Sequence, residues 1–144
     1  MSDQLKHDEH PRAQRGWDTL RQVDGRGGEA VIESLRDLAP DLGRFIVEFA
    51  FGEVISRPGL DLRTRELVTV AALTALGNAR PQLKVHLHGA LNVGCTREEV
   101  LETIIQMAVY AGMPAALNGV FAAREVFDER DEDGARTGHD SGPQ

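Results

Sequence analysis

The chain has 144 residues, a length that corresponds to one domain with a substantial core. Its 23 acidic and 16 basic residues give a net charge of -7, which argues against a nucleic-acid-binding protein because phosphate recognition requires a basic face. The single cysteine, Cys95, excludes an internal disulfide or a CxxC redox pair and indicates a reducing compartment.

The amino-terminal segment is polar and lacks the apolar core of a signal peptide. Every apolar run along the chain is interrupted by a charge, a glycine or a proline before it is long enough to cross a bilayer. We therefore expect a soluble, cytoplasmic protein with no membrane partner.

Both ends of the chain differ in composition from the middle. Residues 1–15 are highly charged, and residues 130–144 are acidic and then rich in glycine and serine. Segments of this kind do not bury enough apolar surface to fold. The composition predicts disordered or frayed tails over 1–15 and 130–144, with one folded domain over 16–129.

Glycines and prolines divide the domain into segments of helical length, and none of these segments keeps the period of two that a strand requires. The sequence therefore predicts an all-α domain of about six helices joined by short turns. The helix that opens at Asp41 is expected to bury four apolar side chains. They are Phe45, Ile46, Phe49 and Val54.

Three later helices carry clear start signals. Asp61 is placed to cap the helix that contains Glu66. Thr96 and Glu99 have the spacing of a capping box. Pro114 suits the first turn of the last helix. The apolar face expected for that helix consists of Leu117, Val120, Phe121 and Phe127.

The segment from Leu67 to Leu76 is apolar nearly all round. A helix of this kind is either central in its own domain or packed under a second subunit. The pattern therefore favours a homo-oligomer.

His86 is the first candidate for chemistry. Helical phase places it with Leu83, Ala90 and Val93 on the apolar face, whereas His88 is two positions on and points about 200° away. The two histidines therefore cannot chelate one metal ion, and we predict no metal site. The alternative role for His86 is a core histidine bonded to a backbone carbonyl or a neighbouring side chain.

Glu66 lies on another apolar helix, near the positive end of its dipole. A carboxylate and an imidazole on neighbouring apolar helices are candidates for proton transfer in a pocket shielded from water. We predict that Glu66 orients or buffers His86. The alternative is a salt bridge between Glu66 and Arg63, three positions earlier.

Arg57, Arg63 and Arg65 surround a Pro-Gly turn and a helix start. Guanidinium groups and free amides at such a place can hold a carboxylate, although a solvated basic rim explains the same cluster. Tyr110 and Asn118 flank the turn in AGMP, where each is able to donate a hydrogen bond to a ligand or to serve in packing and capping.

Three stretches of the chain resemble the carboxymuconolactone decarboxylase family, which shares its helical fold with alkylhydroperoxidase D. They read FGEVISRPGLDLRTRELVTVAAL, then LKVHLHGALNVGCTREEVLETIIQMAVYAGMPAA, and finally AREVF in the last helix. The order and spacing of these motifs carry the resemblance.

The resemblance implies a cofactor-free decarboxylase of aromatic catabolism, which converts 4-carboxymuconolactone into the enol-lactone of 3-oxoadipate and carbon dioxide. His86 matches the family's histidine and is the expected proton donor, with Glu66 as its catalytic partner. The resemblance also implies a trimer or hexamer. The candidates for binding the substrate are Arg57, Arg63, Arg65, His88 and Tyr110.

The chain also departs from the family pattern. The peroxidase branch requires a CxxC pair before its histidine, and this region reads GNARPQLKVH, so thiol peroxidase activity is not expected. Phe51 and Ile55 stand where tryptophans are often found, Glu66 stands where dedicated decarboxylases tend to have a small residue, and AGMPAAL replaces a CGxPAAN-like turn. The open alternatives are a related small acid or lactone as substrate, a biosynthetic cyclase or isomerase, and a non-catalytic binding or scaffold protein.

Overall fold

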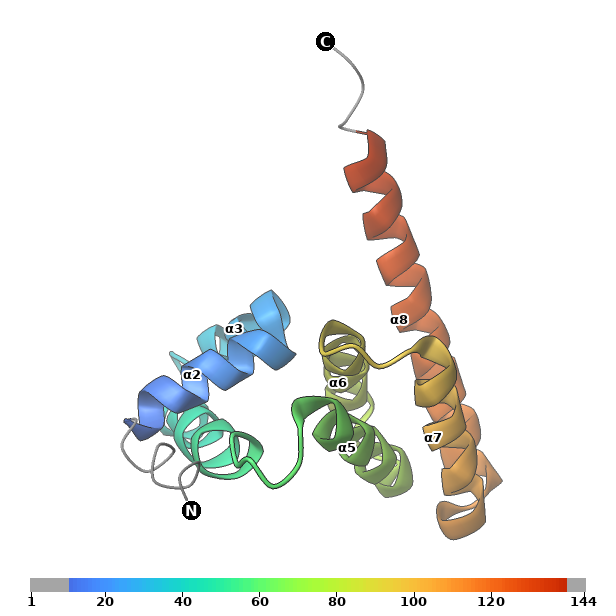
Figure 1. The fold of residues 1–144 in the computed structure, drawn as a ribbon, viewed down its shortest axis with the longest axis horizontal. Helices are drawn as coiled ribbons and strands as arrows, with labels where there is room; N and C mark the ends of the chain where they lie inside the picture. Colours follow the sequence, from blue (N-terminus) through green and yellow to red (C-terminus); the bar gives the residue numbers. More distant parts are fainter. Residues whose placement is uncertain (1–10, 140–144) are drawn as a thin grey trace.

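The computed structural model describes residues 11–139. Within this range the chain forms seven α-helices and one π-helix and contains no strand, which confirms the all-α prediction (Figure 1). The elements are α2 (Arg12–Val23), α3 (Gly25–Ser34), α4 (Pro40–Phe45), η1 (Ile46–Ile55), α5 (Leu62–Leu76), α6 (Arg80–Asn92), α7 (Arg97–Ala111) and α8 (Met113–His139).

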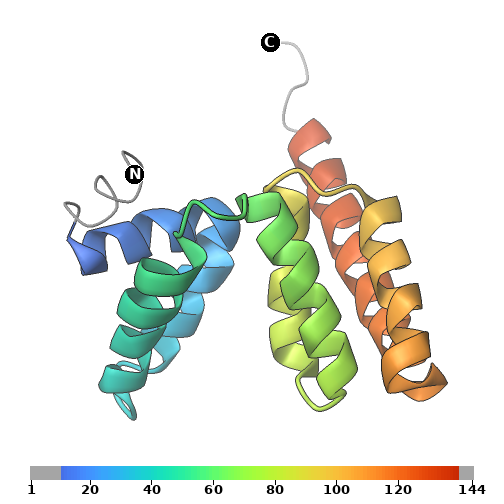
Figure 2. The ribbon, with the colours of Figure 1, turned by 60° about the horizontal axis from the view of Figure 1, so that its bottom comes forward.

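The helices form two groups that meet at α6. Figure 2 shows α2, α3, α4 and η1 on one side, and the paired helices α5 with α6 and α7 with α8 on the other. Each group has its own apolar core, the first around Leu20 and Phe51 and the second around Leu87 and Ile104. Val93, just after α6, packs against both cores. Helix α6 is therefore held from both sides.

The capping signals in the sequence are confirmed. The Asp61 carboxylate accepts a hydrogen bond from the Thr64 amide at 2.7 Å, at the start of α5. Thr96 and Glu99 form a reciprocal capping box at the start of α7, with bonds of 3.1 and 2.8 Å. Both caps satisfy amides that a helix start otherwise leaves without partners.

The apolar face expected after Asp41 is only partly correct. Phe45 and Phe49 are 51% and 63% exposed, and the buried residues of the segment are instead Val47, Phe51 and Gly52. For Phe49 the reason is the π-helix η1, whose i to i+5 hydrogen bonds place more residues in each turn than an α-helix has. The face that points inward is therefore rotated away from the phase that a 3.6-residue repeat predicts.

Helix α2 crosses η1 at very short range. A Cβ atom on Gly16 would lie 2.0 Å from the Val47 carbonyl oxygen, so only glycine permits this approach. The Arg15 side chain adds a hydrogen bond of 3.1 Å to the carbonyl of Gly52. The crossing fixes α2, and with it the turn that leads into α3.

The helical region is longer than the predicted domain over 16–129. Helix α2 begins at Arg12 and α8 continues to His139, so residues 12–15 and 130–139 are helical and not part of tails. Arg97 pairs with Asp131 at 2.6 Å, and Arg130 donates to Asn92 at 3.0 Å, which ties the acidic segment to the domain. Extending a packed helix requires no new nucleation. The rest of both predicted tails, 1–10 and 140–144, lies outside the described residues.

A second correction concerns the face of α8 that packs inward. Leu117 and Phe121 are 53% and 43% exposed, whereas Ala122, Ala123 and Val126 are fully buried.

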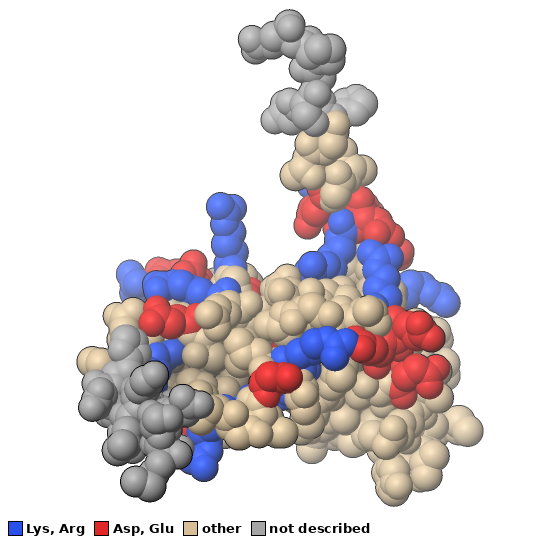
Figure 3. All heavy atoms as spheres, in the orientation of Figure 1, with Lys and Arg blue, Asp and Glu red and all other residues tan. Residues whose placement is uncertain are grey.

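Figure 3 shows few charged side chains around the lower ends of α5, α7 and α8. The exposed apolar residues there are Val68, Leu76, Val109, Tyr110, Met113 and Leu117. None of the described helices is both long and apolar enough to cross a membrane.

The capping box at the start of α7 gives a stability prediction. Replacing Thr96 with Ala removes the acceptor for the Glu99 amide, and we expect the free energy of unfolding to fall by about 1 kcal/mol. Urea denaturation followed by circular dichroism, at one fixed protein concentration, measures the change. The matched control is Thr64→Ala, an exposed threonine in the first turn of α5. An equal loss in both variants would show that the cap is not responsible.

Candidate active site

The two residues proposed from helical phase, His86 and Glu66, contact each other directly. Nδ1 of His86 lies 2.9 Å from Oε2 of Glu66, the geometry of a hydrogen bond in which the imidazole donates. Glu66 is 1% exposed, while the His86 side chain keeps 22% of its surface accessible. The expected alternative for Glu66 is wrong, because Arg63 pairs with Glu99 and donates to the Gly94 carbonyl instead.

A third ionisable residue, Asp24, completes this buried cluster. It lies in the turn between α2 and α3, is 8% exposed, and places Oδ1 3.9 Å from Nδ1 of His86. Asp24 was not predicted from the sequence, although a signal was present. Asp24 follows Leu20 by four positions and so continues the buried face of α2 into the turn.

Gly89 makes room for the two carboxylates beside α6. A Cβ atom at this position would lie 2.8 Å from Oδ1 of Asp24 and 2.9 Å from Oε2 of Glu66. Asn92, one turn later, donates a hydrogen bond of 2.9 Å to the Val23 carbonyl and so holds the end of α2 against α6. Helix α6 therefore supplies both the histidine and the space around it.

Burial and charge shift the pKa values in this cluster. Burial raises the pKa of Asp24 to about 6; the charge of His86 opposes this shift and that of Glu66 adds to it. Burial alone would lower the pKa of His86, but the hydrogen bond and charge of Glu66, together with the charge of Asp24, raise it above its usual range. Both shifts favour the protonated forms of Asp24 and His86.

Two oxygen atoms of the cluster are buried without a hydrogen-bond partner among the described residues, Oδ1 of Asp24 and Oε1 of Glu66. One donor atom each from Asp24, Glu66 and His86 lies within 4.8 Å of the others, a spacing that would also suit a cation. A cation bound there would replace the hydrogen bond between His86 and Glu66. The free oxygens show that the cluster has unused capacity to bind a proton or a ligand.

His86 opens into an apolar cavity of about 400 Å³, here called the His86 cavity. Its polar lining consists of Asp24, Thr69, Gln82 and His86, and no arginine or lysine side chain is among its lining residues. The positions that depart from the family pattern, Phe51 and Ile55, do lie in its wall. The remaining apolar lining includes Leu20, Val31, Ile32, Ile46, Ala50 and Val85.

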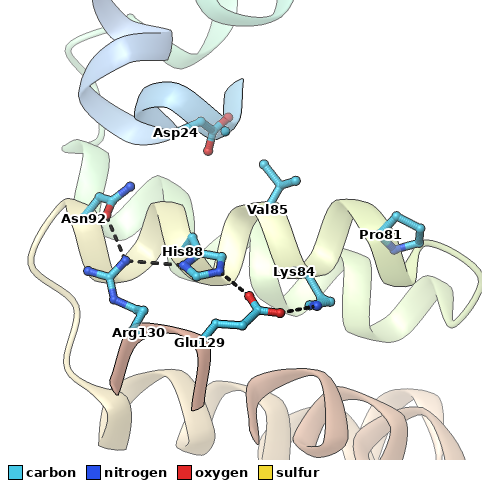
Figure 4. Close-up of a pocket in the computed structure, with 9 residues that line it drawn as sticks. Asp24, Pro81, Lys84, Val85, His88, Asn92, Glu129 and Arg130 are labelled. Atoms are coloured by element: carbon cyan, nitrogen blue, oxygen red, sulfur yellow. Dashed lines mark hydrogen bonds and ion pairs between the residues drawn. The ribbon is translucent and has the colours of Figure 1, made fainter. Parts of the chain in front are cut away.

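A second cavity of about 550 Å³, here called the polar cavity, contains His88 (Figure 4). Nε2 of His88 lies 2.9 Å from Glu129, which also binds Lys84 at 2.6 Å. Arg130 reaches Nδ1 of His88 at 3.4 Å. Asp24 lines both cavities, but the structure does not bring His88 to the His86 cavity.

The other residues predicted to bind substrate lie elsewhere in the single chain. Arg65 donates to the Arg57 carbonyl at 3.0 Å, and Arg57 is exposed. Tyr110 is 79% exposed on α7. None of these residues, nor Arg63, lines the His86 cavity. Their role in binding the substrate therefore stays a prediction.

Comparison with known proteins matches residues 40–125 to the Carboxymuconolactone decarboxylase family. The chain is 45% identical over 98 residues to 4-carboxymuconolactone decarboxylase of Acinetobacter baylyi, covering 68% of this chain and 72% of the relative. It is 30% identical over 132 residues to nitrosuccinic acid decarboxylase of Metarhizium robertsii, covering 90% and 92%. An uncharacterized 15.0 kDa protein of Paracoccus denitrificans is 37% identical over 103 residues, covering 71% and 77%. The chain belongs to the carboxymuconolactone decarboxylase family.

Proposed function

We propose that the protein is a cofactor-free decarboxylase that acts on 4-carboxymuconolactone or a related unsaturated lactone acid. Two relatives that are named as decarboxylases support the assignment of the protein as a carboxy-lyase. The observation that carries the site is the hydrogen bond between His86 and Glu66 at the wall of an apolar cavity. An ionisable pair with a raised histidine pKa in such a place suits proton transfer.

The proposed reaction breaks the bond between carbon and the leaving carboxylate. Its electron pair passes into the conjugated system of the lactone as carbon dioxide departs, and the resulting carbanion equivalent needs a proton at carbon. Because Nδ1 of His86 is bonded to Glu66, Nε2 is the nitrogen left to deliver that proton. The carboxylate of Glu66 stabilises the imidazolium before transfer, and solvent returns the proton afterwards.

The same geometry bears on the alternative functions. A scaffold protein would be expected to keep His86 in a closed interior, bonded only to backbone, whereas this histidine is bonded to a carboxylate beside a cavity of about 400 Å³. A cyclase or isomerase would use the same proton donor but release no carbon dioxide. The relative named for nitrosuccinic acid supports a wider range of small acids as substrates. Carbon dioxide release from 4-carboxymuconolactone is therefore the deciding measurement.

We also propose that the exposed apolar surface of α5, α7 and α8 is covered by further copies of the chain, in a trimer or hexamer. Val109 and Met113 are 77% and 74% exposed there, which is costly for an isolated subunit. A neighbouring copy is also the way in which the predicted arginines or Tyr110 would reach the substrate.

The proton donor is tested by His86→Ala. We expect kcat for carbon dioxide release to fall by about 100-fold or more, because general acid catalysis typically contributes that much, while the far-ultraviolet circular dichroism stays unchanged. The comparison variant is Gln22→Ala, an exposed position of α2 outside the His86 cavity, which is expected to leave kcat within about threefold of wild type. Retained activity in His86→Ala would remove His86 from the mechanism.

The role of Glu66 is tested by its neutral counterpart, Glu66→Gln. The imidazolium is the active form, so activity is present below the pKa of His86 and is lost as pH rises through it. Removing the carboxylate charge lowers the pKa of His86, and we expect the alkaline limb of the pH–rate profile to move to lower pH. An unchanged rate and pH profile would assign Glu66 a purely structural role.

The proposed oligomer is tested by Val109→Asp. A charge at this exposed apolar position should be costly to bury, so we expect the mass measured by size-exclusion chromatography with light scattering to fall towards that of a monomer. Gln22→Asp, which adds the same charge at an exposed position of α2, is the control. A wild-type monomer, or an unchanged mass in Val109→Asp, would contradict the proposal.

A further inference from the structure

The His86 cavity has an unusual charge balance for a site that takes an acid. Its ionisable groups are the lining residues Asp24 and His86, with Glu66 bonded behind His86. When His86 is protonated, its charge balances that of Glu66. An ionised Asp24 then leaves one net negative charge beside the place where the substrate's carboxylate must bind. In a buried site two like charges repel strongly.

Among the described residues, none donates a hydrogen bond to Oδ1 of Asp24. The Asp24 side chain is 4% exposed, and Oδ1 is buried. The distance of 3.9 Å to Nδ1 of His86 is too long for a hydrogen bond, and that nitrogen is already bonded to Glu66. Asp24 is also one of the residues that line the His86 cavity, where a neutral carboxyl group would have an O–H to donate to a ligand.

Resting on the proposed function, we propose that Asp24 is a substrate-binding residue that works as a neutral carboxylic acid. In this form Asp24 donates a hydrogen bond to the acid group of the substrate. Protonation of Asp24 also removes its negative charge, so that an anionic substrate can bind in a cavity that has no arginine or lysine in its lining. Asp24 lies outside residues 40–125, the part of the chain that matches the family.

The pH dependence follows from the groups that surround Asp24. Burial raises the pKa of Asp24 to about 6, so its carboxyl group is mostly ionised at pH 7 in the absence of substrate. A substrate that requires the acid form of Asp24 must therefore bind together with a proton. Affinity should fall as pH rises above the pKa of Asp24. The charged and titratable groups facing Asp24 are Glu66 on α5, Lys84, His86 and His88 on α6, and Glu129 and Arg130 on α8.

Steady-state kinetics of carbon dioxide release compare the wild type with two variants of Asp24. In wild type, KM should rise about fivefold between pH 6 and pH 7 as Asp24 ionises. Asp24→Asn keeps a donor without the charge, so its KM should stay nearly constant over this range. Asp24→Ala lacks the donor, and its KM at pH 6 should rise about tenfold. Asp18→Asn, which changes an exposed aspartate on α2, should behave as wild type.

A binding measurement separates this proposal from the proposed reaction. Calorimetric titration with 2-furoate, an unreactive planar carboxylate, at pH 7 in two buffers of different ionisation enthalpy reports the protons taken up on binding. We expect an uptake in wild type that is larger than in Asp24→Asn by about 0.9 proton. A carbon-13 titration of the Asp24 carboxyl in the wild-type protein, with and without 2-furoate, gives the same information if the variant does not fold.

The outcomes are distinct. Equal proton uptake and the same rise of KM in wild type and Asp24→Asn would overturn the role of Asp24, even if carbon dioxide release is confirmed. Proton-linked binding of 2-furoate without carbon dioxide release would overturn the decarboxylase proposal and leave the role of Asp24 in binding intact. Failure of wild type to bind 2-furoate at pH 6 would also contradict the role of Asp24.

Discussion

The buried hydrogen bond between His86 and Glu66 is the constraint to which the surrounding structure is adapted. A carboxylate that is 1% exposed is destabilising unless a hydrogen-bonded partner offsets the loss of water. The pair therefore requires α5 and α6 to lie at a fixed separation. Gly89 allows the carboxylates to approach α6, and Asn92 holds the end of α2 in place. Glycine and asparagine at these two positions contribute less apolar packing than larger apolar side chains would.

The two halves of the site come from different parts of the chain. Glu66 and His86 lie within the family-matched residues 40–125, whereas Asp24 and the wall formed by Leu20 and Ile32 come from α2 and α3. The pair of Glu66 and His86 thus lies in the matched region, together with nine of the fourteen residues that line the cavity. A substitution in α2 or α3 would change the remaining part of the cavity wall without replacing either member of the pair.

The periodicity of the sequence predicts the features that depend on the residues of one helix alone. It placed His86 and Glu66 on inward faces and located the caps at Asp61 and Thr96, because each of these depends on spacing within a few residues. It failed for Phe49, where a π-helix changes the phase, and for the partners of Arg63, which are distant in sequence. The spacing of Asp24 from Leu20 does indicate a buried position. Its place beside His86 could not be predicted in this way, because His86 lies 62 positions later in the sequence.

The absence of arginine from the lining of the His86 cavity also shapes the proposed cycle. Arg63 is engaged by Glu99 and Arg65 by the Arg57 carbonyl, so within the single chain the positive charge in the lining of the cavity is that of protonated His86. Before the reaction this imidazolium attracts the acid. Once its proton has moved to carbon, the imidazole is neutral and Glu66 is left with an uncompensated negative charge. A product that retains a carboxylate is then repelled by the site that made it, so in the proposed mechanism proton transfer also promotes product release.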